Sequence, residues 1–91
     1  MQIKIEHNED NKRFETQIEG VTAYISYQLK DHVINFDHTI VPAELGGRGI
    51  ASSLVKHALA FARQNNLKVI ASCSFVDSYI NKHPEYQDLL A

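Results

Sequence analysis

Three glycines surround a single arginine at the point where an apolar segment gives way to an amphipathic one. They are Gly46, Gly47 and Gly49, with Arg48 between the last two. Glycine permits a positive φ and lets another group approach the backbone closely, because it has no Cβ. When such a turn opens a helix, the free N–H groups and the helix dipole favour an anion. The segment therefore predicts a phosphate-type site, although a sharp turn without any ligand would also explain the glycines.

Two side chains elsewhere in the chain could take part in group transfer. His38 falls on the same alternation as Ile34, Phe36 and Ile40, so it is either a general base or a buried, hydrogen-bonded core histidine. Cys73 is the one cysteine and lies where a strand is expected to meet a helix, a position that lowers the pKa of a thiol. It is either an acyl-carrying nucleophile or a small buried side chain. The histidines lack the spacing of a metal site, so no metal is predicted.

Composition limits the classes of protein that this chain can belong to. Its 91 residues are 44% hydrophobic and 22% charged, which predicts one globular domain over residues 1–91. A formal net charge of −2 argues against nucleic-acid binding. No apolar run reaches the roughly 18 residues that span a membrane, and the beginning of the chain does not resemble a secretory signal. The single cysteine cannot form an internal disulfide, so we expect a reduced, cytoplasmic setting. We also expect a monomer or weak dimer.

Hydrophobic periodicity predicts an α+β fold. Alternating segments followed by turn residues indicate a meander of four strands, after which the period becomes helical. The expected strands cover residues 3–8, 12–19, 21–29, 32–41 and 67–73, and the expected helices cover residues 50–64, 74–82 and 84–91. The last strand should pair parallel to the fourth through a right-handed crossover. Ser74 is the expected N-cap of the second helix, with Asp77 in the capping-box position.

The segment GGRGIASSLV resembles the acyl-CoA pyrophosphate loop of the GNAT superfamily of N-acetyltransferases. The superfamily pattern Gln/Arg-x-x-Gly-x-Gly/Ala falls on Gly46, Gly49 and Ala51. HTIVP and the tail CSFVDSYINKHPEYQDLL are similar to a small stand-alone branch, so the resemblance covers roughly residues 37–90. Two features depart from the superfamily. Gly46 replaces the usual Gln or Arg, and the chain has no room for the helices and strands that normally help to form the acceptor pocket.

The resemblance implies a minimal GNAT-like fold, mostly antiparallel, with a parallel pair formed by strands four and five and a helix after each. Those two strands would splay apart to admit the pantetheine arm of acetyl-CoA or coenzyme A. Backbone groups near strand four would pair with that arm, and the glycine loop would hold the pyrophosphate, with Arg48 as a charged contact or an ordinary surface arginine. The implied cofactor-binding residues are Ile40, Val41, Gly46, Gly47, Arg48, Gly49, Ile50, Ala51 and Ser52.

The implied activity is transfer of an acetyl group from acetyl-CoA to an unidentified amine, on a small molecule or a protein. His38 is the candidate base for direct transfer, and Cys73 is the candidate nucleophile for a covalent route. Tyr79 is expected to pack in the core, with proton donation to the leaving thiolate as its other possible role, and His83 is expected to anchor a helix end. Two alternatives stay open: a non-catalytic CoA-binding module, and an interaction domain that keeps only the fold.

Overall fold

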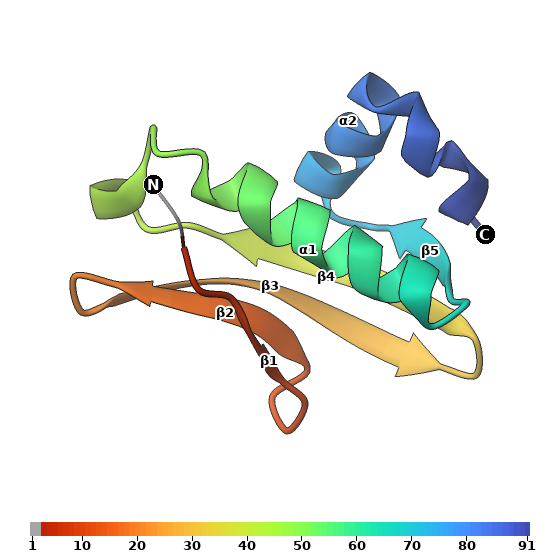
Figure 1. Ribbon diagram of the computed structural model, residues 1–91, viewed down its shortest axis with the longest axis horizontal. Helices are drawn as coiled ribbons and strands as arrows, with labels where there is room; N and C mark the ends of the chain where they lie inside the picture. Colours follow the sequence, from red (N-terminus) through yellow and green to blue (C-terminus); the bar gives the residue numbers. More distant parts are fainter. Residues whose placement is uncertain (1–2) are drawn as a thin grey trace.

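Two α-helices lie on one side of a five-stranded sheet in the computed structural model, which describes residues 3–91 (Figure 1). The strands are β1 (Glu6–Asn8), β2 (Arg13–Ile18), β3 (Val21–Lys30), β4 (Val33–Ile40) and β5 (Lys68–Ala71). The helices are α1 (Ile50–Gln64) and α2 (Ser74–Lys82), with 3-10 turns η1 (Ala43–Leu45) and η2 (Pro84–Leu89). None of the helices in the described part of the chain is long and apolar enough to cross a membrane.

The strands lie in the sheet in the order in which they occur in the chain, from β1 to β5. The first four pair antiparallel through short turns, and β5 pairs parallel to β4 after the crossover through α1. The predicted α+β fold, with its parallel pair and a helix after each of these two strands, is confirmed.

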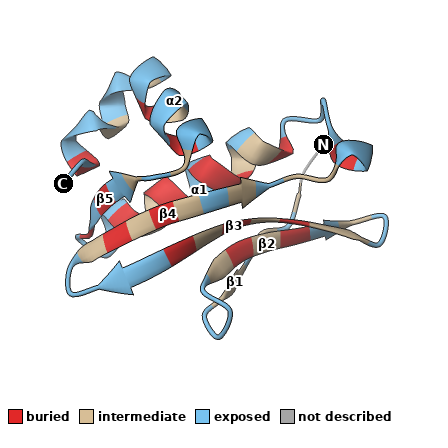
Figure 2. Cartoon of the chain, turned by 180° about the vertical axis from the view of Figure 1, so that it is seen from behind, coloured by how far each residue is buried: buried red, intermediate tan, exposed pale blue. Residues whose placement is uncertain are grey.

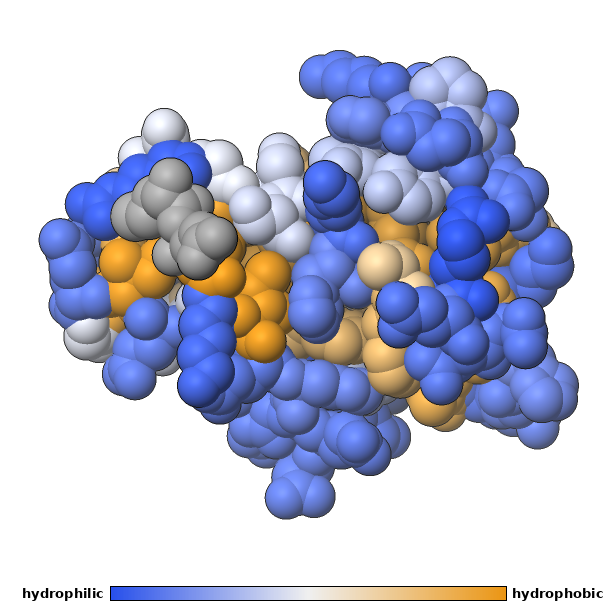
Figure 3. Space-filling view, in the orientation of Figure 1, coloured by the Kyte–Doolittle hydropathy of each residue, from blue (hydrophilic) through white to orange (hydrophobic). Residues whose placement is uncertain are grey.

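The hydrophobic core lies between the sheet and the helices. Alternate residues of each strand turn toward α1, and α1 turns its apolar stripe toward them. The largest fully buried side chains are Phe14, Phe36, Ile25, Ile34, Leu45, Ile50, Leu54, Leu59 and Ile80. Viewed from the side shown in Figure 3, hydrophilic residues cover most of the surface, and hydrophobic residues are visible between them.

No helix of the described residues 3–91 covers the opposite side of the sheet, which we call the open face. Along the strands, buried residues alternate with intermediate or exposed ones (Figure 2). The buried ones belong to the face that packs against the helices. The fold therefore has two layers, and one surface of the sheet is accessible to solvent.

A β-bulge interrupts the alternation of β4. Ser26 of β3 opposes His38, but the next residue, Tyr27, opposes Phe36, so Asp37 is the extra residue. Phe36 is fully buried, whereas His38 is exposed. The prediction that His38 shares the face of Ile34 and Phe36 is therefore wrong, because the bulge reverses the alternation after Phe36.

The ends of α1 are set by residues that tolerate unusual backbone angles. Gly49 precedes the helix with φ of 72°, and Asn66 follows it with φ of 56°. Beyond Asn66, the N–H of Leu67 donates to the carbonyl of Ala62 at 2.9 Å, and the N–H of Asn66 donates to that of Arg63 at 3.3 Å. This pair of bonds is a Schellman motif, so the predicted end of α1 has a clear local cause.

Three local predictions need correction. The first strand begins at Glu6 and is shorter than expected. Cys73, and not Ser74, is the N-cap of α2, and no side chain caps that end, so the expected capping box does not form. The last segment is a 3-10 helix from Pro84, because its carbonyls bond to residues three positions on, as at Tyr86 and Leu90.

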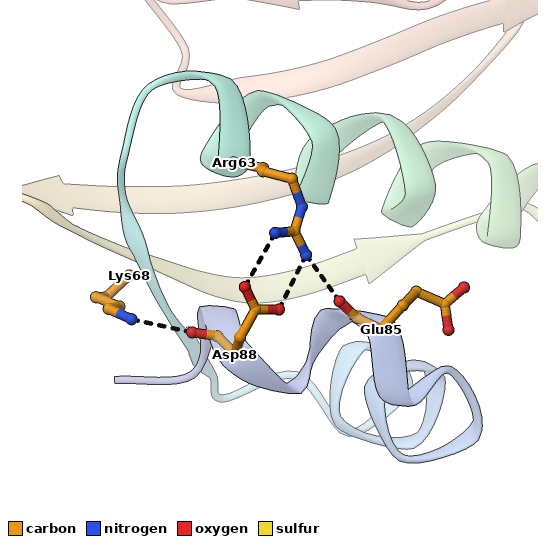
Figure 4. Close-up of polar contacts among 4 residues, drawn as sticks. All are labelled: Arg63, Lys68, Glu85 and Asp88. Carbon is orange, nitrogen blue, oxygen red and sulfur yellow. Dashed lines mark hydrogen bonds and ion pairs between the residues drawn. The ribbon is translucent and has the colours of Figure 1, made fainter.

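The C-terminal segment is tied to α1 and β5 by polar contacts (Figure 4). Arg63 pairs with the carboxylate of Asp88, at 2.9 Å for the shorter contact, and also donates to the carbonyl of Glu85 at 2.7 Å. Lys68 donates to the carbonyl of Asp88 at 2.9 Å. These contacts hold η2 beside the end of α1, where Leu89 completes the core.

Candidate functional site

Strands β4 and β5 stop pairing before β4 ends. Their last paired residues are Phe36 and Ala71, whereas β4 continues to Ile40. The N–H of Cys73 donates to the carbonyl of Phe36 at 2.9 Å, and α2 begins immediately afterwards. We call the place where the two strands separate the fork. It is formed where the bulge of β4 meets the start of α2.

Cys73 and Thr39 face each other at the fork. The Cys73 thiol donates to the Thr39 hydroxyl, with 3.4 Å between Sγ and Oγ1. Burial by itself would raise the pKa of the Cys73 thiol, but the Thr39 hydroxyl and the backbone N–H groups of Val76, Phe75 and Thr39 lower it below its ordinary value. The half-buried sulfur therefore carries more thiolate character than an ordinary cysteine.

Thr39 is the residue at this site that the sequence pattern did not identify. The uninterrupted alternation of Ile34, Phe36, His38 and Ile40 assigns Thr39 to the face away from the core. The bulge reverses that assignment, and Thr39 opposes the buried Ile25. Only knowledge of the cross-strand register could have identified it.

His38 lies on the open face, because it opposes Ser26. It is exposed, so the alternative of a buried core histidine is wrong. Its neighbour Asp37 accepts a hydrogen bond from the Ser26 hydroxyl at 2.5 Å. His38 and Cys73 therefore approach the fork from different sides of the sheet.

The glycine loop, which we define as residues 46–49, connects η1 to α1. Gly47 and Gly49 have φ of 79° and 72°, and an added Cβ would meet nothing within 4 Å at either position. These glycines are therefore required by backbone conformation and not by packing. Gly46 has an ordinary φ, but its Cβ would lie 3.2 Å from the carbonyl oxygen of Ala43.

The first turn of α1 offers free hydrogen-bond donors. Ser53 is the first residue whose N–H bonds to a carbonyl at the helix start, that of Gly49 at 3.1 Å. The N–H groups of Ile50, Ala51 and Ser52 have no acceptor within residues 3–91. The first turn also has no acidic side chain. The positive end of the helix dipole is therefore free to interact with an anion.

Arg48 is engaged in an ion pair. Its Nη2 lies 3.2 Å from Oε2 of Glu19, in the turn between β2 and β3. Both side chains are substantially exposed, so the pair contributes little to stability. An anion at the loop would compete with Glu19 for this guanidinium.

The other predicted cofactor residues lie at the end of β4, in the glycine loop and in the first turn of α1. Ile40 is 43% exposed, and Val41 is half-buried beside the core. Gly46, Gly47, Arg48, Gly49 and Ser52 are exposed, Ala51 is intermediate, and Ile50 is buried. Ile50 could thus contribute its backbone N–H but not its side chain.

His83 caps the end of α2, as predicted. Its Nδ1 donates to the carbonyl of Tyr79 at 2.8 Å, and the two rings stack with centroids 4.0 Å apart. Burial raises the pKa of Tyr79, and the nearby Tyr86 and Glu85 raise it further. These contacts assign both residues to the packing of α2 against η2.

Neither a metal-type cluster nor a surface hollow near the N-terminal strands points to a second chemical site in the described chain. Residues 3–91 contain no group of three or more His, Cys, Asp or Glu side chains placed to hold a metal ion. A hollow of about 350 Å³ lies over the N-terminal strands, away from the fork, and is lined by Lys4, Glu6, Glu15, Thr16, Gln17 and Thr22. None of the candidate catalytic residues lies in it.

Comparison with known proteins identifies relatives over almost the whole chain. A family model described as GCN5-related N-acetyl-transferase matches residues 13–89. Protein NATD1 of Mus musculus is 31% identical over 85 residues, which cover 90% of this chain and 77% of that protein. Protein NATD1 of Homo sapiens is also 31% identical, with 90% and 75% covered. An NMR structure of a GCN5-like protein from Staphylococcus aureus superposes with a TM-score of 0.76, at 38% identity, and the match covers 97% of this chain and 87% of that one.

Proposed function

The chain belongs to the GCN5-related N-acetyltransferase family, and on that basis we propose that it binds acetyl-CoA and transfers the acetyl group to a primary amine. The observation that carries the proposal is the fork: β4 runs on to Ile40 after its pairing with β5 has ended. An extended ligand with amide groups can bind there as an added strand would. The pantetheine arm of coenzyme A is such a ligand.

The bulge indicates which backbone groups of β4 face this ligand. The Phe36 carbonyl points toward β5, because it accepts from the N–H of Cys73. Since alternate residues of a strand point the same way, and the bulge adds one residue, Thr39 and Val41 should point into the gap. The influence of the Thr39 N–H on the pKa of Cys73 supports this direction. We therefore assign pairing with the pantetheine arm to Thr39 and Val41, one residue away from the position expected for Ile40.

The glycine loop is the proposed pyrophosphate site. The free N–H groups of Ile50, Ala51 and Ser52 supply donors, and the positive φ of Gly47 and Gly49 brings the loop backbone round to the helix start. To contact a phosphate oxygen, Arg48 would break its ion pair with Glu19 or would bind Glu19 and the phosphate at the same time.

Direct transfer is the proposed route. The nitrogen of a neutral amine forms a bond to the thioester carbon, the carbon–sulfur bond breaks, and coenzyme A leaves as the thiolate. The amine loses one proton, which His38 on the open face could accept. Free backbone N–H groups at the gap in β4 could donate to the developing oxyanion.

A titration with acetyl-CoA followed through backbone amide signals tests cofactor binding. We expect shifts at Thr39, Val41 and residues 47–53. Binding without any acetylation across a panel of amines would make the chain a CoA-binding module. No binding of acetyl-CoA or coenzyme A would contradict the proposal and leave an interaction domain with the family fold.

A covalent route through Cys73 is the second candidate, favoured by the lowered pKa of its thiol. The acetyl group would pass to Sγ with release of coenzyme A, and then to the amine. Acetyl-CoA alone should then add one acetyl group that hydroxylamine removes, as measured by intact-protein mass spectrometry. Under direct transfer, Cys73→Ala keeps most of the turnover and His38→Ala loses more. A wild-type rate for Cys73→Ala would eliminate the covalent route.

A further inference from the structure

Strand β1 contacts the core through a histidine. His7 is the middle residue of this three-residue strand, which lies at the edge of the sheet (Figure 1). It opposes the buried Phe14 of β2, and directly opposed residues share a face, so His7 points toward the helices. Glu6 and Asn8 precede and follow it, and they point to the open face. Among the three residues of β1, His7 is therefore the one that packs inward.

The imidazole of His7 lies among aromatic rings from three other elements. It stacks on Phe14 with centroids 4.3 Å apart, and it meets the ring of Phe61 of α1 edge-on, at 4.8 Å. Its third neighbour is the ring of Tyr27 of β3, at 5.6 Å. We call His7, Phe14, Tyr27 and Phe61 the ring cluster. Because the cluster joins β1 to β2, β3 and α1, the charge on one imidazole bears on the contacts of the whole strand.

The hydrogen bond of His7 within the ring cluster suits a neutral imidazole. Its Nε2 lies 2.6 Å from the hydroxyl oxygen of Tyr27, a residue that is only 4% exposed. A neutral ring with its proton on Nδ1 accepts the Tyr27 proton at Nε2. When both ring nitrogens carry protons, Nε2 can only donate, so the Tyr27 proton loses this acceptor. Protonation of His7 would therefore bury a charge and also cost a hydrogen bond.

The groups around His7 act on its pKa in opposite directions. Burial has the largest effect and lowers the pKa of His7 below its ordinary value of 6.5. The carboxylate of Glu9, in the turn after β1, raises this pKa, and His57 on α1 lowers it. The titratable neighbour on β3 is Tyr27, whose own pKa is raised by burial and by Glu9, so it stays a neutral phenol.

A hollow of about 340 Å³ borders His7 at the turn between β1 and β2. It is lined by Glu6, His7, Asn8, Glu9, Asp10 and Glu15, and four of these six residues are acidic. Glu6 pairs with Lys4, and Glu15 pairs with Arg13 of β2 at 2.9 Å. Neither Glu9 nor Asp10 has an ion-pair partner among the described residues 3–91. The hollow therefore offers negative charge to a cationic ring, beside a cluster that favours the neutral one.

We propose that His7 is a pH-sensitive anchor for β1: the neutral imidazole holds the strand in the ring cluster, and the protonated ring turns to the carboxylates of the hollow and frees β1 from β3 and α1. The strand is easily released, because only three of its residues pair with β2. The first of these pairs sets Glu6 directly opposite Glu15, and like charges in that position weaken a strand pair. Because β1 and the fork lie at opposite ends of the strand order, the inference does not depend on the proposed acetyl transfer.

The direction of the pH effect follows from the lowered pKa of His7. The released strand binds a proton more readily than the docked strand, so docking is favoured above pH 6.5 and loses this advantage as the pH falls through the folded-state pKa. Ring signals of His7 report protonation, and amide protection factors of residues 6–8 report release. We expect these protection factors to fall at least about twofold between roughly pH 7.5 and pH 5, while those of β3 and β4 hold.

Four variants separate His7 from other titrating groups. His7→Phe keeps an aromatic ring that cannot be protonated, so the protection of residues 6–8 should stay constant. Glu9→Gln removes a carboxylate that raises the pKa of His7, and release should move to lower pH. His57→Gln removes a group that lowers this pKa, and release should move to higher pH. His32→Gln removes an exposed histidine outside the ring cluster and should behave as the parent does.

Two results would overturn the proposal. If residues 6–8 of the parent keep their protection down to pH 5, the imidazole does not anchor β1. If His7→Phe loses protection on acidification as steeply as the parent, another group controls the strand. Should His7→Phe fail to fold, the two exposed variants decide the question, because a release midpoint that is unchanged in both Glu9→Gln and His57→Gln contradicts the assignment to His7.

Discussion

The sulfur of Cys73 lies 3.4 Å from the hydroxyl oxygen of Thr39, although 34 residues separate the two in the sequence. The two side chains meet at the fork, on the side of the sheet that faces the helices. Thr39 reaches this position because Asp37 is an extra residue in β4. The proximity of the two side chains thus depends on a bulge two residues away.

Thr39→Val should make Cys73 less reactive toward an alkylating reagent at neutral pH. Valine has nearly the same shape but no hydroxyl to favour the thiolate, so the pKa of the thiol should rise. The pH dependence of iodoacetamide alkylation measures this directly. A midpoint that stays the same in Thr39→Val would show that the backbone N–H groups alone lower the pKa.

Gly49→Ala and Gly47→Ala should weaken acetyl-CoA binding. Each alanine would have to adopt a positive φ, at a cost of about 1–2 kcal/mol. Gly20, with φ of 77° in the turn between β2 and β3, offers a matched control with the same backbone strain. Denaturation and calorimetry together should show similar losses of stability for all three variants and a loss of affinity for the loop variants only. Equal affinities in the three variants would remove the loop from the cofactor site.

Glu19→Gln should bind acetyl-CoA at least as tightly as the parent, because it frees Arg48 from its ion pair. Arg48→Ala should bind more weakly, by about 1 kcal/mol or less for so exposed a group. Both changes should leave the melting temperature nearly unchanged. Calorimetry at low and high salt checks the pair, and an affinity that falls in Glu19→Gln would argue against a phosphate contact by Arg48.

Leu89→Ala should destabilise the domain by about 2–4 kcal/mol, whereas Leu90→Ala should have little effect. The two leucines are neighbours, but Leu89 is 6% exposed and Leu90 is 39% exposed. Truncation after Lys82 removes Leu89 together with the contacts of Arg63 and Lys68 to Asp88, and it should cost more than either substitution. Urea denaturation measures all three, and an unchanged midpoint in the truncated protein would show that η2 is loosely attached.

Asp37→Asn should lose stability relative to the parent at neutral pH, and the difference should shrink on acidification. The pKa of Asp37 in the folded protein lies below its ordinary value of 3.8. The ionised carboxylate therefore stabilises the fold above pH 3.8, and this contribution is lost as the pH falls through the folded-state pKa. Denaturation curves for both proteins across this range provide the measurement. A difference that grows as the pH falls would mean that the carboxylate is not favoured by folding.

The glycine loop and α1 could be predicted because their causes are local. Three glycines identify the loop, and α1 is identified by the change from alternating to helical periodicity and by the two asparagines at its end. None of these signals needs tertiary information. The 3-10 conformation from Pro84 could not be predicted, because packing of η2 against α1 decides it. The N-cap at Cys73 could not be predicted either, because it depends on the path of the chain from β5.

The bulge at Asp37 was beyond prediction for a different reason. Ile34, Phe36, His38 and Ile40 give an uninterrupted alternation, and only the register with β3 shows where it breaks. Because Asp37 is an extra residue, His38 lies on the open face and not on the core face that the alternation predicts. For the same reason, Thr39 lies at the fork, which the alternation does not indicate.

The order of strands in the sheet has a consequence for the route by which the chain folds. Strands β1 to β4 follow one another in space as in sequence, so each hairpin can close a short loop at little entropic cost. Strand β5 reaches β4 only after η1 and α1 have been traversed, and contacts between distant segments form slowly. We therefore expect the meander to nucleate first and the fork to be among the last regions to become native. A newly synthesised chain would therefore form its hairpins before it forms the fork, where the candidate site lies.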